Sequence, residues 1–93
     1  MKYYIYLLTN KSDSVIYTGM TNNLQRRINE HREGFGSKFT KKYNVRKLVY
    51  YEEFENVYDA IQREKQIKGG SRKKKLELIH SMNPLFTDLY DQL

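Results

Sequence analysis

An arginine and a histidine share one face of a predicted helix with apolar side chains. Leu24 and Ile28 define an apolar stripe of helical period, and Arg27 and His31 lie on the same stripe. A charged group on a core-facing position is costly unless a partner compensates it. Arginine can stabilise the charge that a phosphate gains during transfer, and histidine can orient or carry a proton. The pair is therefore a candidate for phosphoryl-transfer chemistry if further functional groups lie beside it.

A carboxylate interrupts the apolar stripe of another predicted helix. Glu64 lies between Ile61 and Ile67, three residues from each. A carboxylate in such a position can hold a divalent cation. Two structural explanations are also open: a buried ion pair with Arg27, or a helix pair with Lys68 four residues further on.

Two tyrosines and a glycine could complete such a site. The β-prone runs YYIYLLT and VIYTG are separated by the turn-like segment NKSDS. Pairing them as a hairpin about this loop predicts Tyr6 opposite Tyr17 and Tyr4 opposite Gly19, with all four on one face. A phenol can accept or position a proton, and a glycine leaves room for a phosphate. We expect Arg27, His31 and Glu64 to oppose this same sheet face, and the whole set resembles a phosphoryl-transfer site.

The elements that position these side chains follow from turn and capping signals. Strands are predicted at Tyr3–Thr9, Val15–Gly19 and Arg46–Phe54. Helices are predicted from about Asn23 to Glu33, from the N-cap Asn56 to Lys68, and from the N-cap Ser71 to about Ser81. The order β-β-α-β-α-α predicts an α/β (α+β) fold, a small three-stranded sheet flanked by helices. A chain of 93 residues is expected to form one domain, residues 1–93.

Composition narrows the function classes. The formal charge of +6 and the pI near 9.5 favour a polyanionic partner. The chain has no cysteine, which excludes disulfides, thiolate metal sites and cysteine nucleophiles. No apolar run approaches the ~20 residues of a membrane helix, and the N-terminus is typical of a strand rather than a signal peptide. We therefore expect no membrane association and a cytoplasmic location.

The positive charge is concentrated in residues 63–75, where Glu64 is the only acidic residue. Phosphate contacts are expected from this run, and the candidates are Arg63, Lys68, Arg72, Lys73 and Lys74. A solvated, lysine-rich face without a ligand is the alternative interpretation.

In order and spacing, these residues resemble the GIY-YIG nuclease family over nearly the whole chain. Tyr4-Ile5-Tyr6 is similar to the first motif of the family, and Tyr17-Thr18-Gly19 is similar to the second. The run from Asn22 to His31 resembles the helix that carries the catalytic arginine and a histidine four residues later. Arg63-Glu64 resembles the segment with the metal-binding glutamate, and Asn83 resembles a late asparagine.

Two further segments, Ile67–Gly70 and Asn83–Phe86, resemble the compact bacterial branch that consists of this domain alone. Members of that branch usually carry a bulky aromatic residue in place of Gly70. The incision subunit of bacterial excision repair has a lysine where this chain has Met20, so one potential phosphate contact of that branch is missing.

The resemblance implies a role for each candidate. Tyr17 would be the general base for the attacking water, and Tyr6 would position it. Arg27 would stabilise the pentavalent phosphate, and His31 would orient its neighbours or share proton transfer. Glu64 would hold a single divalent ion, Mg²⁺ or Mn²⁺, while Gly19 and Asn83 would contact the substrate.

The predicted function is metal-dependent endonucleolytic hydrolysis of phosphodiester bonds in DNA, in repair or processing. DNA is favoured over RNA as the partner, and a monomer is favoured as the oligomeric state. One alternative is a nucleic-acid-binding module that has the nuclease fold but little or no cleavage activity. The other is an interaction protein whose basic face meets an acidic partner.

Overall fold

A three-stranded antiparallel sheet of order β2-β1-β3 forms the centre of the fold. The computed structural model describes residues 1–93. The strands are β1 (Tyr3–Thr9), β2 (Ile16–Thr21) and β3 (Lys47–Phe54); the helices are α1 (Leu24–Arg32), α2 (Lys38–Lys42), α3 (Val57–Lys68), α4 (Arg72–Met82) and the 3₁₀ turn η1 (Tyr90–Gln92). The predicted α+β class with a three-stranded sheet is confirmed.

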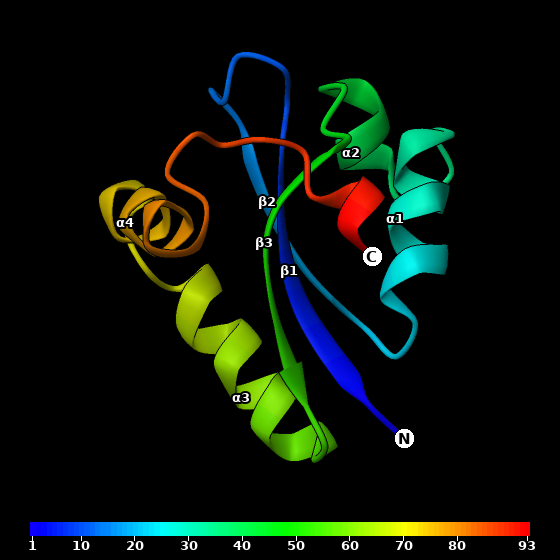
Figure 1. Ribbon diagram of the computed structural model, residues 1–93, viewed down its shortest axis with the longest axis vertical. Helices are drawn as coiled ribbons and strands as arrows, with labels where there is room; N and C mark the ends of the chain where they lie inside the picture. The colour runs from blue at the N-terminus through cyan, green and yellow to red at the C-terminus, as the bar shows by residue number, and fades with distance from the viewer.

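The helices cover both faces of the sheet. Figure 1 shows the sheet close to edge-on, with α1 and α2 on one side and α3 and α4 on the other. One apolar cluster lies under α1 and contains Tyr6, Leu8, Leu24, Ile28, Val45, Leu48 and Leu89. The second lies under α3 and α4 and contains Ile5, Leu7, Val49, Tyr50, Ile67 and Ile79. Strand β1 is buried on both faces because it is the middle strand.

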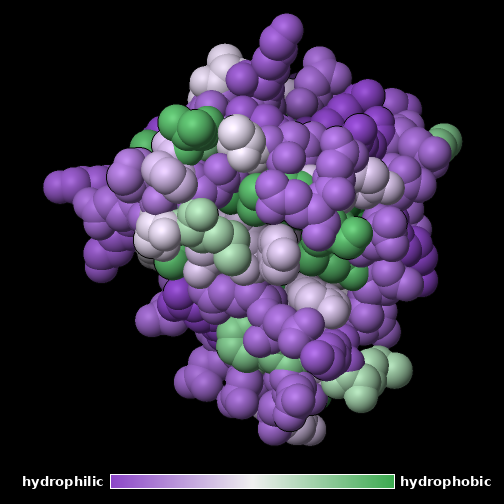
Figure 2. Space-filling model, viewed as in Figure 1, coloured by the Kyte–Doolittle hydropathy of each residue, from purple (hydrophilic) through white to green (hydrophobic).

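The surface of the protein is mostly polar, as its composition predicts. The face seen in Figure 2 is mostly hydrophilic, with apolar groups in small separate areas. None of the helices is long and apolar enough to cross a membrane.

The three long helices begin close to their predicted positions, and an N-cap side chain precedes each one. Asn23 accepts a hydrogen bond from the backbone N–H of Arg26 at 3.1 Å, and Asn56 accepts from the N–H groups of Tyr58 and Asp59. Ser71 caps α4 in the same way. Each cap satisfies backbone donors that have no partner inside the helix.

The predicted register of the β1–β2 hairpin is wrong by two residues. Tyr6 lies opposite Gly19, and Leu8 lies opposite Tyr17. Side chains alternate along a strand with a period of two, so a two-residue shift leaves the same side chains on the same face. The four predicted residues therefore still share the face under α1.

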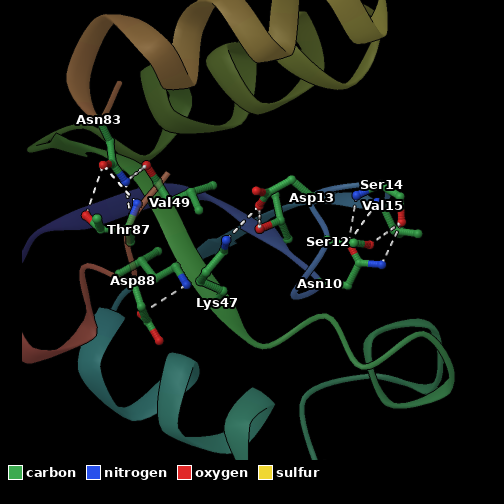
Figure 3. A network of polar contacts seen from close by, with 12 residues as sticks. Asn10, Ser12, Asp13, Ser14, Val15, Lys47, Val49, Asn83, Thr87 and Asp88 are labelled. Atoms are coloured by element: carbon green, nitrogen blue, oxygen red, sulfur yellow. Dashed lines mark hydrogen bonds and ion pairs between the residues drawn. The ribbon is translucent and has the colours of Figure 1, made fainter. Parts of the chain in front are cut away.

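The loop between these strands explains the shift. The side chain of Asn10 accepts hydrogen bonds from the N–H groups of Ser14 and Val15 at 2.9 and 3.0 Å (Figure 3). Asp13 adopts a left-handed backbone with a φ of 60°. This organised turn takes up Val15, so β2 starts at Ile16 and continues beyond Gly19 to Thr21.

Asn83 has a structural place at the end of α4. Its side-chain amide donates to the carbonyl oxygens of Val49 at 3.1 Å and Thr87 at 2.7 Å (Figure 3). Its side-chain oxygen accepts from the backbone N–H and the hydroxyl of Thr87, each at 3.1 Å. All of its hydrogen-bonding capacity is used to tie α4 and the C-terminal segment to β3. The structure therefore does not place the predicted substrate contact Asn83 among the residues that could meet a substrate.

Candidate active site

A largely buried chain of hydrogen bonds joins three of the four predicted catalytic residues, Tyr6, Arg27 and His31. The hydroxyl of Tyr6 lies 2.9 Å from Nε2 of His31, and Nε of Arg27 donates to the same hydroxyl at 3.4 Å. On the other side of the ring, Nδ1 of His31 lies 3.0 Å from the hydroxyl of Thr40. The side chains of Tyr6, His31 and Thr40 are at most 1% exposed. His31 therefore points inward, as predicted.

Arg27 lies at the edge of this chain and is about 29% exposed. One terminal nitrogen donates to the carbonyl oxygen of Gly36 at 2.7 Å, and the other donates to the carboxylate of Glu30 at 3.2 Å. Its ion pair is therefore with Glu30, and the alternative of a buried Arg27–Glu64 pair is not what the structure contains. The guanidinium is fixed in place but still reaches solvent.

Tyr17 packs beside the chain without joining it. Its ring centroid lies 5.5 Å from that of His31 and 6.3 Å from that of Tyr6, and it stacks on Phe39 at 6.0 Å. The ring is partly exposed, and its hydroxyl has no hydrogen-bond partner within the protein. A phenol held by its ring and free at its oxygen is available to a bound reactant.

Two glycines allow this close packing. A Cβ atom on Gly19 would lie 2.4 Å from the ring and the hydroxyl of Tyr6, and one on Gly36 would lie 1.9 Å from Nδ1 of His31. Neither position tolerates a side chain without displacing the rings. Gly19 thus makes room for Tyr6, whereas the sequence predicted that it makes room for a phosphate.

Glu64 approaches from the other face of the sheet, because α3 packs against the face opposite to α1 (Figure 1). The prediction that the glutamate opposes the same sheet face as Arg27 and His31 is therefore wrong. Its side chain is 21% exposed, makes no hydrogen bond, and lies 3.7 Å from the ammonium group of Lys68. Of the two structural explanations for Glu64, the structure therefore contains the ion pair with Lys68 within one helix.

Burial sets the protonation of the two central groups. Burial raises the pKa of Tyr6 to about 12 against the opposing effect of its hydrogen bond from Arg27, and the charge of Glu64 adds to the rise. Burial, with the positive charge of Arg27 second, lowers the pKa of His31 to about 4. At neutral pH Tyr6 is therefore a phenol and His31 a neutral imidazole.

The lowered pKa of His31 predicts acid-sensitive folding. An unfolded histidine binds a proton near pH ~6.5, but the folded site does so only near pH 4, so protons favour the unfolded chain. The free energy of unfolding should fall by about 2 kcal/mol between pH 7 and pH 5. Denaturant titrations at the two pH values measure this loss.

The chain provides a matched control for this measurement. His80, on α4, is the only other histidine and is exposed. The loss should remain in His80→Gln and disappear in His31→Gln. An equal loss in both variants would contradict the assignment to His31.

The predicted phosphate-binding residues divide into two groups. The guanidinium of Arg63 is held by the carboxylate of Glu52 at 2.9 to 3.2 Å. Arg72 donates to the carbonyl oxygens of Asp13 and Ser14 at 2.7 and 2.8 Å, which anchors α4 to the β1–β2 loop. The lysines of the run, Lys68, Lys73 and Lys74, are exposed.

The sequence interpretation missed the segment between α1 and β3. Thr40, Gly36 and Phe39 all contact the site, yet residues 34–45 were assigned to no element. Helix α2 is only five residues long and buries one side chain, so it shows no apolar periodicity. The available signal was Ser37, a good N-cap three residues before Thr40.

Comparison with known proteins gives a family match over most of the chain. Residues 2–77 match the family model of the GIY-YIG catalytic domain. The chain is 49% identical over 78 residues to a UPF0213 protein of Clostridium perfringens, covering 84% of this chain and 83% of that protein. It is 44% identical over 78 residues to a UPF0213 protein of Staphylococcus saprophyticus, covering 84% and 94%.

A solved structure extends the likeness to the fold. The solution NMR structure of a UPF0213 protein from Bacillus halodurans aligns with a TM-score of 0.61 and 33% identity, covering 95% of this chain and 93% of that chain. The family match spans the site from Tyr6 to Glu64, and Asn83 lies outside it.

Proposed function

Because this chain belongs to the GIY-YIG family of nucleases, we propose that it is a divalent-metal-dependent endonuclease that hydrolyses phosphodiester bonds in DNA, in repair or processing. The observation that carries the proposal is the fixed chain from Arg27 through Tyr6 to His31, next to the free hydroxyl of Tyr17. It combines a cation for a phosphate with a phenol for a proton.

Arg27 is the proposed phosphate ligand. A guanidinium has five N–H donors, of which Tyr6, Gly36 and Glu30 accept three. Two donors remain on a group that is fixed on three sides and partly exposed. Such a preorganised cation can stabilise the charge that develops on a phosphate in the transition state.

The two tyrosines have different proposed roles. Tyr17 would accept the proton of the attacking water, because its hydroxyl is free and its ring is held by stacking. Tyr6 keeps its own proton at neutral pH and is hydrogen-bonded to both Arg27 and His31. We assign Tyr6 to positioning Arg27, and His31 to positioning Tyr6.

Glu64 fits a weakly held divalent ion. Its carboxylate has no hydrogen bond and only a distant lysine contact, and no cluster of three or more histidine or acidic side chains surrounds it. Mg²⁺ and Mn²⁺ accept one carboxylate together with waters and phosphate oxygens. When bound, such an ion would supply Lewis-acid stabilisation of the phosphate and the leaving oxygen.

Cleavage assays test the proposal. The purified chain is incubated with duplex, single-stranded and branched DNA and with RNA, in Mg²⁺, in Mn²⁺ or with a chelator. We expect cleavage of DNA that requires the divalent ion. Binding without cleavage under all conditions would favour a nucleic-acid-binding module, and the absence of both would favour an interaction protein with an acidic partner.

The proposed DNA-binding role of the basic run predicts a specific salt effect. Lys73 and Lys74 are exposed at the start of α4 and are proposed to contact phosphates. Each phosphate contact contributes about 0.9 to the slope of log affinity against log salt for duplex DNA. The double variant Lys73→Ala/Lys74→Ala should therefore lower that slope by up to about 1.8, as measured by fluorescence anisotropy.

Arg72→Ala is the comparison, because its guanidinium is held by the β1–β2 loop. This variant should lower thermal stability and leave the slope nearly unchanged. If the double lysine variant leaves the slope as it is, the lysines form only a solvated face.

A further inference from the structure

The hydroxyl of Thr40 is in an unusual position for a residue of a short surface helix. It is 1% exposed and lies against the ring of the central histidine. Its three polar neighbours are Nδ1 of His31 at 3.0 Å, the hydroxyl of Ser37 at 2.9 Å and the carbonyl oxygen of Ser37 at 3.3 Å. The hydroxyl of Thr40 has one hydrogen and can donate it to only one of these neighbours. Which neighbour accepts it decides the donor and the acceptor in every hydrogen bond from Thr40 to Arg27.

Every hydrogen in this series of hydrogen bonds finds an acceptor if the donation runs from Arg27 towards Ser37. Arginine can only donate, so Nε–H of Arg27 must donate to the hydroxyl oxygen of Tyr6. The hydrogen of Tyr6 then has one acceptor within reach, Nε2 of His31. A neutral imidazole that accepts at Nε2 carries its hydrogen on Nδ1 and donates it to Thr40. The hydroxyl of Thr40 donates its hydrogen bond to the carbonyl oxygen of Ser37, which can only accept.

The opposite direction leaves a buried hydrogen without a partner. With the hydrogen of His31 on Nε2, the oxygen of Tyr6 would receive hydrogens from both His31 and Arg27. The hydrogen of Tyr6 itself would then have no acceptor in the protein, although this side chain is 1% exposed. A buried donor without a partner costs free energy, so the first direction is preferred.

We propose that Thr40 is a positioning residue of the active site, whose hydroxyl holds His31 in the tautomer with the hydrogen on Nδ1. This tautomer turns the hydrogen of Tyr6 toward His31 and leaves a lone pair of Tyr6 for Arg27. The consequence for cleavage rests on the proposed nuclease function, whereas the tautomer itself does not.

The fold gives this hydroxyl a fixed place. Ser37 is the N-cap of α2, and its hydroxyl accepts a hydrogen bond from the backbone N–H of Thr40 at 3.1 Å. Gly36, next to Ser37, lies so close to His31 that a Cβ atom there would meet the ring. The carbonyl oxygen of Gly36 also accepts the hydrogen bond from Arg27. A short helix with little core contact is thus tied to both His31 and Arg27.

Two substitutions separate the hydroxyl from the shape of the side chain. Thr40→Val keeps the branched shape and removes the acceptor, while Thr40→Ser keeps the acceptor and removes a methyl group. Long-range ¹H–¹⁵N NMR spectra distinguish a protonated ring nitrogen from an unprotonated one. The spectrum contains two imidazoles, and exposed His80 is the internal reference.

We expect the native protein and Thr40→Ser to show His31 with a protonated Nδ1 and an unprotonated Nε2. Thr40→Val should lose this pure state and populate the other tautomer. A native protein with the hydrogen on Nε2 would overturn the proposal, as would an unchanged tautomer in Thr40→Val. If the valine variant does not fold, the spectra of the native protein and the serine variant still give the decision.

Cleavage rates then test the consequence. Under single-turnover conditions Thr40→Val should cut about 10- to 100-fold more slowly, by analogy with the loss of the partners that orient metal-bound histidines. Its affinity for DNA should be unchanged, and Thr40→Ser should retain nearly the native rate. Equal slowing in both variants would overturn the role in cleavage. A native protein without any cleavage would refute the nuclease proposal, while the spectra would still decide the tautomer.

Discussion

Replacing Glu64 with alanine should lower divalent-dependent DNA cleavage by at least about a hundredfold, because it removes the carboxylate that is proposed to hold the ion. The fold should tolerate the change. The carboxylate makes no hydrogen bond, and its only ion-pair partner is Lys68 at 3.7 Å on the same helix. A helix pair four residues apart at this distance contributes little to stability.

The measurement is a single-turnover cleavage assay over a range of Mg²⁺ concentrations, with DNA affinity and thermal melting recorded on the same samples. Glu77→Ala is the matched control, because Glu77 is an exposed helical glutamate without an ion pair. The control should cut like the native protein. A Glu64→Ala variant that cuts normally, or that unfolds, would show that the carboxylate has a structural role instead.

Local signals predicted most of the elements correctly. Helix caps and apolar strands depend on residues close in sequence. The structure contains the predicted caps Asn56 and Ser71 and the predicted strand β1. The same holds for the inward orientation of His31, because a stripe of period 3.6 fixes which side of a helix is buried.

Relations across the sheet were harder to predict. A stripe on α3 shows that Glu64 lies at the edge of an inward face, but not which face of the sheet the helix covers. That choice depends on how the chain crosses over the sheet after β3. The hairpin register likewise depends on the hydrogen bonds that Asn10 makes inside its loop.

Thr40 and Gly36 are the residues that local reasoning could not find. A threonine in a short lysine-rich segment resembles any surface residue, and a glycine in a loop resembles a turn. Their roles arise from the ring of His31, which α1 brings into contact with them. Only the folded arrangement reveals that the site extends into α2.

Replacing Tyr17 with phenylalanine should lower the cleavage rate by about 10²- to 10⁴-fold, the range for losing a general base. Its ring packing on His31 and Phe39 is retained, and its hydroxyl has no partner within the protein. The melting temperature should therefore stay close to the native value. Tyr43→Phe is the matched control, because Tyr43 is exposed and packs on the same Phe39, and it should cut normally.

Tyr6→Phe should behave differently from Tyr17→Phe, which separates the two proposed roles. Loss of the Tyr6 hydroxyl leaves the buried Nε2 of His31 and the Nε of Arg27 without a partner, at a cost of about 1 to 3 kcal/mol in stability. Both variants should cut slowly, but only Tyr6→Phe should also unfold more easily. Equal stability losses in the two variants would contradict this division.

The pH dependence of cleavage identifies the base. A phenol ordinarily ionises near pH ~10, so a rate that depends on its phenolate should rise from pH 7 to pH 9, by up to about tenfold per unit. His31 cannot produce this rise, since its pKa near 4 leaves it neutral throughout that range. Single-turnover rates of the native protein and Tyr17→Phe across pH 6 to 9 give the profile. A flat profile together with an active Tyr17→Phe would remove Tyr17 from the role of general base.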